Sequence, residues 1–344
     1  MAVTTYEALS STDTTTTRTL LHESIPLTGT IISGTYNEEN IKNYTHGQFQ
    51  SVYDYPFLSS SANHIFDITV GYDESSPLSG STGATLESKK INMYNQFSQV
   101  LLGYTSSNND VRKFELDLDL DEVNVLPEAY FIPLSRLITK DQIKEGTVSI
   151  TLGTGSHANP FALRKTLTDA SASATSNTKA ALGGEYGLLY ESDVSTESIR
   201  GLVFYQAGMV VLSTSSFDGV TDFHSSSGTA QSIADVFVSS SISGACDALR
   251  RRIQNISFNN TTEINSSIYF CRIPSNNYNH SANPSYVSGS KIRVKDVESD
   301  TPVSYITTVG LYSSDNTLMA IAKLSEPLKK DPTNQITLRV RLDY

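Results

Sequence analysis

The last ten residues of the chain alternate between apolar and polar side chains almost without a break. The apolar set shares one face of an extended segment and consists of Ile336, Leu338, Val340, Leu342 and Tyr344. The polar set shares the opposite face and consists of Thr337, Arg339, Arg341 and Asp343. Because successive side chains of a strand point to opposite faces, this period of two predicts a strand with one buried face.

Two further runs, 303–312 and 317–324, precede this strand and are separated by a short turn of Ser, Asp and Asn residues. Such a turn between apolar runs is typical of a β-hairpin. We therefore expect residues 303–344 to form a closing three-stranded sheet, held by packing up to its last residue. We also expect this sheet to be the most stable part of the protein, so that deleting the last ten residues abolishes folding.

The composition favours β-structure along the whole chain. Hydrophobic residues make up only 38%, and much of the remainder is Ser, Thr and Asn, which favour turns and strand surfaces over helix interiors. We expect a mainly-β fold of antiparallel sheets, arranged as a sandwich, with two or three short helices and long polar loops. A chain of 344 residues is long enough for one large β domain or two smaller ones.

The domain organisation is predicted from changes in composition. Residues 1–25 are rich in Thr and poor in large apolar residues, which predicts a flexible N-terminal arm. A β-rich body follows over 26–344. One interpretation divides this body into two packed sub-domains, 26–155 and 185–344, joined by a Ser/Ala/Gly-rich excursion over 156–184.

Two segments carry clear helical periodicity. Residues 85–102 place apolar side chains at three- and four-residue steps, and Gly103 follows as a C-cap. Residues 242–254 predict a second helix, with Arg250, Arg251 and Arg252 as its solvated side. Thr139 to Gln142 has the form of a capping box, which predicts a short helix ending at Gly146.

Several shorter runs are predicted to be strands. They include an edge strand over 27–36 with Gly kinks and an alternating strand over 111–120. The others are 64–72, 147–152, 185–190, a hairpin over 199–212, and two strands at 256–258 and 267–273 separated by an Asn/Thr turn. Residues 129–137 form a further apolar run.

The charge and the absence of targeting signals exclude several classes of function. The formal net charge of −11 argues against a nucleic-acid-binding protein, because such a surface needs a basic patch. No run approaches the ~20 apolar residues of a membrane span, and the first residues lack the pattern of a signal peptide. Two cysteines, Cys246 and Cys271, are too few for a disulfide framework, and we expect both to be small buried apolar side chains.

One acidic stretch comes close to a calcium-binding pattern. Asp117, Asp119, Asp121 and Glu128 occupy positions one, three, five and twelve of such a loop, but Glu122 stands at position six, where the loop has Gly. The Leu-Asp alternation favours a solvated acidic strand face instead. The histidines show no ligand spacing and no nucleophile elbow is present. The sequence therefore predicts no catalytic, cofactor-binding or metal-binding residues.

Three segments of the closing stretch, Tyr305–Tyr312, Leu318–Lys330 and Leu338–Tyr344, resemble the end of structural proteins of contractile-tailed bacteriophages, especially those of marine bacteria and cyanobacteria. Ile91–Val100 and Asn255–Ile264 are similar to the same group. The resemblance implies a non-enzymatic virion protein of the tail, baseplate or neck. It further implies a homo-oligomer, assembled in the host cytoplasm, whose partners are its own copies and neighbouring virion proteins.

Two alternative functions stay open from the residues alone. The Asn/Tyr/Ser-rich loop over 276–286 suits a carbohydrate- or host-surface-binding fibre or adhesin module, because exposed aromatic rings stack on sugars. A hydrolase on a β scaffold would need clustered carboxylates in a cleft. For assembly, we expect residues 1–25 to add as a strand to a neighbour's sheet, so that their deletion spares folding but impairs assembly.

Overall fold

Antiparallel β-structure dominates the chain, with few and short helices, as the sequence predicted. The computed structural model describes residues 6–26, 38–80, 84–105, 109–174, 177–191, 198–226, 228–281, 284–289, 291–293, 297 and 299–344. The chain divides into two compact units, Leu21–Thr262 and Met1–Leu20 together with Glu263–Tyr344. Strands β1 (Thr14–Pro26) and β15 (Ile253–Ile273) each contribute residues to both units.

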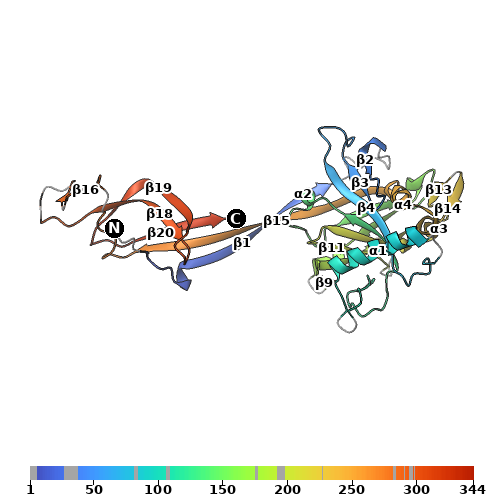
Figure 1. Ribbon diagram of the computed structural model, residues 1–344, viewed down its shortest axis with the longest axis horizontal. Helices are drawn as coiled ribbons and strands as arrows, with labels where there is room; N and C mark the ends of the chain where they lie inside the picture. The colour runs from blue at the N-terminus through green and yellow to red at the C-terminus, as the bar shows by residue number, and fades with distance from the viewer. Residues whose placement is uncertain are drawn as a thin grey trace. The chain divides into compact units, whose positions relative to one another are not determined.

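The unit Leu21–Thr262 is built on one antiparallel sheet (Figure 1). From β15 the strand order is β7-β8-β10-β11-β12-β5-β4-β3-β2, with β6 also paired to β15 and β9 to β10. The strands are β2 (Ile41–Asn43), β3 (Gln50–Tyr53), β4 (His64–Tyr72), β5 (Glu128–Pro133), β6 (Gln142–Ile143), β7 (Ser149–Gly153), β8 (Arg164–Thr168), β9 (Thr178–Ala181), β10 (Gly184–Glu191), β11 (Ile199–Phe204) and β12 (Met209–Ser213). Strands β13 (His224–Ser226) and β14 (Thr229–Gln231) form a separate small hairpin.

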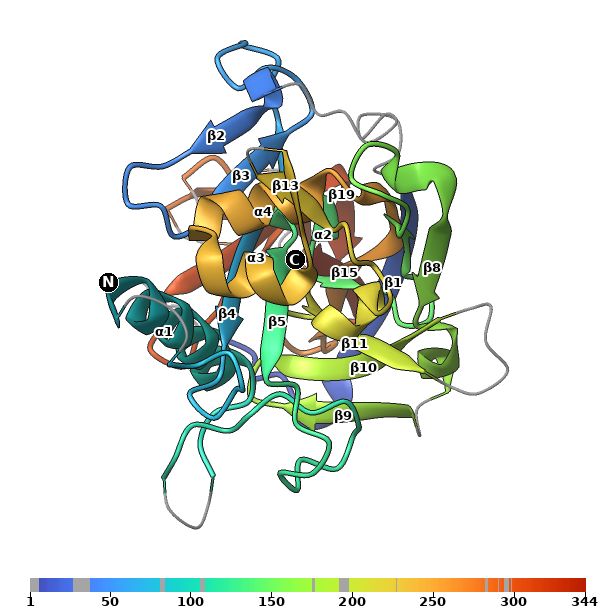
Figure 2. The ribbon, with the colours of Figure 1, turned by 90° about the vertical axis from the view of Figure 1, so that its right-hand side faces the viewer.

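Helices cover this sheet at strand β4. The helices are α1 (Ala84–Leu101), α2 (Arg136–Thr139), α3 (Ile233–Ser239) and α4 (Ile242–Arg250). Helices α1 and α4 both contact β4, and α3 packs beside α4 (Figure 2). A Cβ atom at Gly71 of β4 would lie 2.7 Å from the backbone oxygen of Lys90, so the missing side chain lets α1 approach closely.

Apolar side chains fill both faces of the sheet. Along β5, Tyr130 and Ile132 belong to a core cluster that includes residues of α3 and α4, whereas Ala129 and Phe131 belong to a second cluster. That second cluster includes residues of α1 and of the segment 114–126. The central strands are therefore buried on both sides, which explains their nearly continuous apolar sequence.

The second unit contains the closing strands β18 (Ser304–Tyr312), β19 (Leu318–Lys330) and β20 (Ile336–Asp343), and the short pair β16 (Val287–Ser288) and β17 (Lys291–Ile292). The predicted alternation of the last strand is confirmed. The predicted three-stranded closing sheet is wrong, because β18 and β19 pair only with each other among the described strands. Strand β20 pairs instead with β15, from Ser266↔Asp343 to Ile273↔Ile336, since the long β15 offers a free backbone edge over those eight residues.

The distribution of buried residues also changes the expectation that the closing strands are the most stable part of the protein. Both core clusters consist of residues between 41 and 258, so neither includes the closing strands. We therefore expect amide hydrogen exchange of the full chain to be slowest in β4, β5, β11 and β12, and faster in β18 and β19. Deleting residues 335–344 should leave the slow amides protected. Slowest exchange in β18 and β19 would contradict this expectation.

Many local predictions are confirmed. The helix predicted over 85–102 is α1, and Gly103 has the positive φ of 82° and the backbone bond to Ser98 typical of a C-cap. The hairpin predicted over 199–212 is β11 and β12, closed by the pair Phe204↔Met209. Strands β4, β7 and β10 also match their predicted segments, and β5 begins the apolar run 129–137.

Other local predictions are wrong because side chains bond differently from the expected pattern. Thr139 ends helix α2 and does not begin one; its hydroxyl donates to the backbone oxygen of Ser135, and Lys140 breaks the helix with a φ of 58°. The helix predicted over 242–254 ends at Arg250, and Ile253 already begins β15. The segment 111–120 contains no strand, since its acidic side chains bond to backbone N–H groups of the same segment.

Two predicted loops are part of the sheet. The excursion over 156–184 contains β8 and β9. The Asn/Thr turn expected between 258 and 267 is the middle of β15, which continues without a break from Ile253 to Ile273. There Asn260 pairs with Ile143, and its side-chain amide donates to the backbone oxygen of Ile138. An asparagine side chain that forms its hydrogen bond with a neighbouring segment can stay within a strand, so no turn is required.

The predicted domain boundaries also differ from the structure. Where a flexible arm was expected over 1–25, residues 14–26 form β1, which pairs with β15 at one end of the strand order. The unit boundaries fall near residues 20 and 262, not at 155 and 185. Long-range pairing of the first and last parts of the chain decides both the strand over 14–26 and the unit boundaries. The amino-acid composition gives no indication of this pairing. The strand expected over 27–36 lies outside the described residues.

Candidate functional site

The acidic segment 111–126 is fixed to the body by a buried tyrosine. Its two ends pair through the backbone bond from Leu126 to Phe114. The hydroxyl of Tyr94 in α1 accepts from the backbone N–H of Phe114 at 3.0 Å and donates to the backbone oxygen of Leu126 at 2.8 Å. Phe114 also packs edge-on against the Tyr94 ring, with centroids 5.3 Å apart. The second core cluster, to which Tyr94 and Phe114 belong, therefore holds this segment in position.

Three carboxyl groups of this segment lie together. Ligand oxygens of Glu115, Asp117 and Asp121 are all within 4.8 Å of one another. Both oxygens of Glu115 accept backbone N–H bonds, from Asp121 and Glu122, each at 3.0 Å. Glu115 is only 3% exposed, and burial raises its pKa, as do the charges of Asp117 and Asp121. We call Glu115, Asp117 and Asp121 the carboxylate cluster.

This arrangement differs from the calcium pattern read in the sequence. Asp117 and Asp121 belong to the carboxylate cluster, but Asp119 is exposed and contributes only its backbone N–H, which donates to Asp117. The N–H of Glu122 donates to Glu115, and Glu128 accepts from Ser76 in another part of the unit. Glu115 was missed, although it stands two residues before Asp117 in the same alternation.

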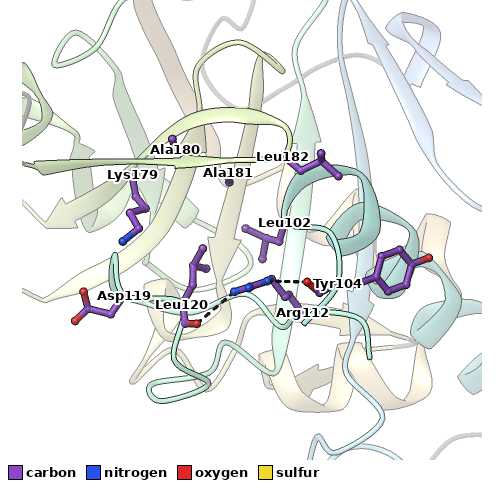
Figure 3. A pocket seen from close by; sticks show the side chains of 9 residues that line it. All are labelled: Leu102, Tyr104, Arg112, Asp119, Leu120, Lys179, Ala180, Ala181 and Leu182. Atoms are coloured by element: carbon purple, nitrogen blue, oxygen red, sulfur yellow. Dashed lines mark hydrogen bonds between the residues drawn. The ribbon is translucent and has the colours of Figure 1, made fainter. Parts of the chain in front are cut away.

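A hollow of about 530 Å³ lies beside the same segment (Figure 3). Its charged lining consists of Arg112, Asp119 and Lys179. The Arg112 guanidinium donates to the backbone oxygens of Tyr104 at 3.1 Å and Leu120 at 3.3 Å, so both of these contacts are structural. Lys179 extends into the hollow from β9, on the side where Asp119 lies. The hollow is open and mixed in charge, and the described residues that line it form no arrangement of catalytic groups.

The predicted basic surface of the second helix is wrong. Arg250 is 3% exposed and pairs with Asp247 at 2.7 Å, and Arg252 is 1% exposed. Arg251 alone of the three is exposed. The guanidinium of Arg252 donates to four backbone oxygens, those of Phe223, Gly153, Gly155 and Asp222. Burial lowers its pKa to about 10. Arg252 therefore joins three segments of the interior and is not a binding residue.

Cys246 fits the expectation of a small buried apolar side chain better than Cys271 does. Cys246 is fully buried in α4, its thiol donates to the backbone oxygen of Ile68, and burial raises its pKa. Cys271 is half-buried on β15, and burial raises its pKa too. Both thiols are free. Raised pKa values oppose thiolate formation, so neither residue has the character of a nucleophile.

The loop over 276–286, considered for glycan stacking, presents its tyrosines unevenly. Tyr278 is 40% exposed, whereas Tyr286 is half-buried and its ring lies 5.9 Å from that of His280. The hydroxyl of Tyr286 is buried without a hydrogen-bond partner among the described residues. A sugar platform needs broad exposed ring faces, and only Tyr278 supplies one here.

A second group of carboxylates bears on the hydrolase alternative. Asp169 is fully buried and accepts bonds from the N–H groups of Val148 and Gly146 and from the Tyr205 hydroxyl, at 2.8–3.0 Å. Both of its oxygens are thus committed to structural donors. Near it, burial raises the pKa of Glu145 to about 7, and a hydrogen bond and charge repulsion from Glu185 add to the effect.

Glu145 should make stability depend on pH. Its pKa is about 7 in the folded chain and near 4.5 ordinarily, so its unfavourable contribution is absent below pH 4.5 and complete above about 7. The variant Glu145→Gln should match the wild type at pH 4.5 and unfold at higher denaturant concentration at pH 8. The control Glu74→Gln, at an exposed position, should show no such change. Equal midpoints for Glu145→Gln and wild type at pH 8 would refute the argument.

Comparison with known proteins identifies no relative of this chain. No protein-family model matches the chain, and neither a curated protein nor a solved structure is detectably similar to it. Within the described residues, no helix is both long and apolar enough to cross a membrane.

Proposed function

We propose that the chain is a non-enzymatic structural protein of a tailed-bacteriophage virion. In this proposal it assembles with copies of itself and with neighbouring virion proteins in the tail, baseplate or neck. The observation that carries the proposal is the hairpin of β18 and β19. Five of its large apolar side chains are more than 40% exposed: Tyr305, Tyr312, Leu318, Met319 and Ile321.

Among the described strands, this hairpin has no third strand paired to it. A two-stranded hairpin alone is at best marginally stable in water, and β18 and β19 pair with no other described strand. The described residues of its unit contribute to neither core cluster. Exposed apolar side chains gathered on one element mark a surface that another protein covers. The unit Glu263–Tyr344 with residues 1–20 therefore supplies the contact surface in this proposal.

Two further observations support assembly. Three of the five segments that resemble phage structural proteins fall on β18, β19 and β20, to which the core clusters do not extend. The other two fall on α1 and β15. Strand β1 lies at the end of the strand order, and its residues 15–24 are exposed. An exposed edge strand can accept a strand from a neighbouring subunit. Head-to-tail contacts of this kind generate a closed symmetric ring when the rotation between subunits closes.

The proposal is tested on particles and on the purified chain. Mass spectrometry of purified virions whose genome encodes this chain should detect it at a fixed ratio to other tail proteins. Light scattering of the isolated chain should show a discrete oligomer. A chain absent from virions, and monomeric at the concentrations of assembly, would refute the proposal. The carbohydrate-binding alternative would be favoured by specific glycan binding that Tyr278→Ala abolishes.

A further inference from the structure

A small pocket lies between helix α1 and strand β4. Asp67, Thr69 and Gly71 alternate along β4, so their side-chain positions share one face of the strand. At Gly71 the helix comes close, because a Cβ atom there would lie 2.7 Å from the backbone oxygen of Lys90. At Thr69 and Asp67 the helix leaves a cavity of about 210 Å³. We call it the Asp67 pocket; its lining residues are Phe49, Asp67, Thr69, Met93, Phe97 and Pro133.

The aromatic walls of the Asp67 pocket are positioned by the protein itself. The ring of Phe97 in α1 stacks on Phe131 of the second core cluster, with centroids 4.5 Å apart. The ring of Phe49 contacts the rings of Tyr44 and His46, with centroid distances of 4.7 and 5.0 Å. A site whose walls are already in place loses little conformational freedom on binding, which favours a specific ligand.

Asp67 supplies the charge in the lining of this pocket. Its Oδ1 accepts from the hydroxyl of Ser51 and from Nε2 of His64, the latter at 2.8 Å, whereas its Oδ2 accepts from no described residue. Among the described residues no lysine or arginine forms an ion pair with Asp67, and His64 is charged only when protonated. The hydroxyl of Thr69 already donates to the backbone oxygen of Gln48. One carboxylate oxygen is therefore left for a ligand.

We propose that the Asp67 pocket binds a lysine side chain of another protein. The ammonium group pairs with the free oxygen of Asp67, and the alkyl chain lies against the apolar lining. Aromatic rings such as those of Phe49 and Phe97 attract an ammonium group within about 6 Å of their centres. The formal net charge of −11 favours a basic protein as the partner over a second copy of this chain.

The geometry of the pocket selects lysine among the cationic ligands. An arginine pairs best with both oxygens of a carboxylate, but Ser51 and His64 already bond to Oδ1 of Asp67. A volume of about 210 Å³ admits one side chain but lies below the ~300 Å³ of common small-molecule sites. The pocket lies in the unit Leu21–Thr262 and the proposed assembly surface on β18 and β19, so either proposal can fail without the other.

Methionine-methyl NMR of the full chain tests the pocket, because Met93 lines it whereas Met209 and Met319 do not. The probe is the peptide acetyl-Gly-Lys-Gly-amide. It should shift the Met93 methyl signal in a saturable way and leave those of Met209 and Met319 unchanged. The same peptide with norleucine in place of lysine should bind at least about tenfold more weakly, and the arginine peptide should also bind more weakly. No saturable shift up to ~20 mM lysine peptide, equal binding of the norleucine peptide, or tighter binding of the arginine peptide would overturn the proposal.

Two isosteric variants separate the pocket from general attraction to an acidic chain. Asp67→Asn keeps an oxygen that can accept from Ser51 and His64, so it should fold like the wild type. It should weaken binding of the lysine peptide about tenfold and leave binding of the norleucine peptide unchanged. The control Glu39→Gln removes one charge at an exposed position before β2 and should change binding by less than about twofold. Equal weakening by both variants would overturn the proposal, since that result indicates diffuse attraction to an acidic surface.

Discussion

Replacing Arg252 with alanine should unfold the unit Leu21–Thr262 under conditions where the wild type is fully folded. The guanidinium donates to the backbone oxygens of Gly153, Gly155 and Asp222 at 2.6–3.0 Å, and to that of Phe223 at 2.9 Å. Its carbon also lies 4.7 Å from the centre of the Phe223 ring. The variant removes the guanidinium donor from these four acceptors. It also leaves a cavity at one of the largest fully buried side chains of the described residues. We expect a loss of about 4 kcal/mol or more in the free energy of unfolding.

The neighbouring arginine supplies a matched control for this experiment. Arg251 is exposed, so Arg251→Ala should change the free energy of unfolding by less than about 0.5 kcal/mol. The variant Arg252→Lys should fall between the two, because one ammonium group cannot reach every acceptor that the planar guanidinium serves. Chemical denaturation followed by circular dichroism measures all three. Equal, small losses for Arg252→Ala and Arg251→Ala would show that the buried network is unimportant.

Charges placed on the β18–β19 hairpin should convert the proposed oligomer into monomers. Met319 and Ile321 of β19 are 70% and 57% exposed and alternate along the strand, so they share one face. If this face is covered in the assembly, the double variant Met319→Lys with Ile321→Lys buries two ammonium groups against apolar surface. We expect the dissociation constant of the oligomer to rise by about a hundredfold or more, measured by sedimentation velocity.

The same chemical change elsewhere on the chain separates assembly from solubility. Leu137 of α2 is 80% exposed and lies in the unit Leu21–Thr262, so Leu137→Lys should leave the oligomer intact. The far-ultraviolet circular dichroism of each variant should match the wild type. If the hairpin variant assembles like the wild type, the contact surface lies elsewhere and the role proposed for β18 and β19 is wrong.

The carboxylate cluster could be predicted only in part. The spacing of Asp117 and Asp121 is visible in the sequence, and Glu115 continues the same alternation. The local pattern also favoured a strand, whereas the acidic side chains bond to nearby N–H groups and hold the chain in a loop.

Two buried charged side chains, those of Lys90 and Arg252, show the same limit of prediction from a local sequence pattern. Lys90 stands on the polar side of the pattern in α1, yet it is fully buried, and its ammonium donates to the backbone oxygens of Phe237 and Ser240. Burial lowers its pKa to about 8. Arg252 likewise follows two arginines that suggest a solvated surface. Hydropathy ranks both residues as surface residues, because it contains no information about acceptors brought in from distant segments.

The sequence by itself determined the mainly-β class, helix α1 with its C-cap, the hairpin of β11 and β12, and the alternation of the last strand. Each of these depends on interactions within some twenty residues, where periodicity and turn chemistry decide the outcome. The tertiary structure alone decided that β20 pairs with β15, that residues 14–26 form a strand, and that 253–273 is one uninterrupted strand. Those outcomes depend on backbone groups far apart in the chain finding one another, and a local pattern of side chains does not specify that pairing.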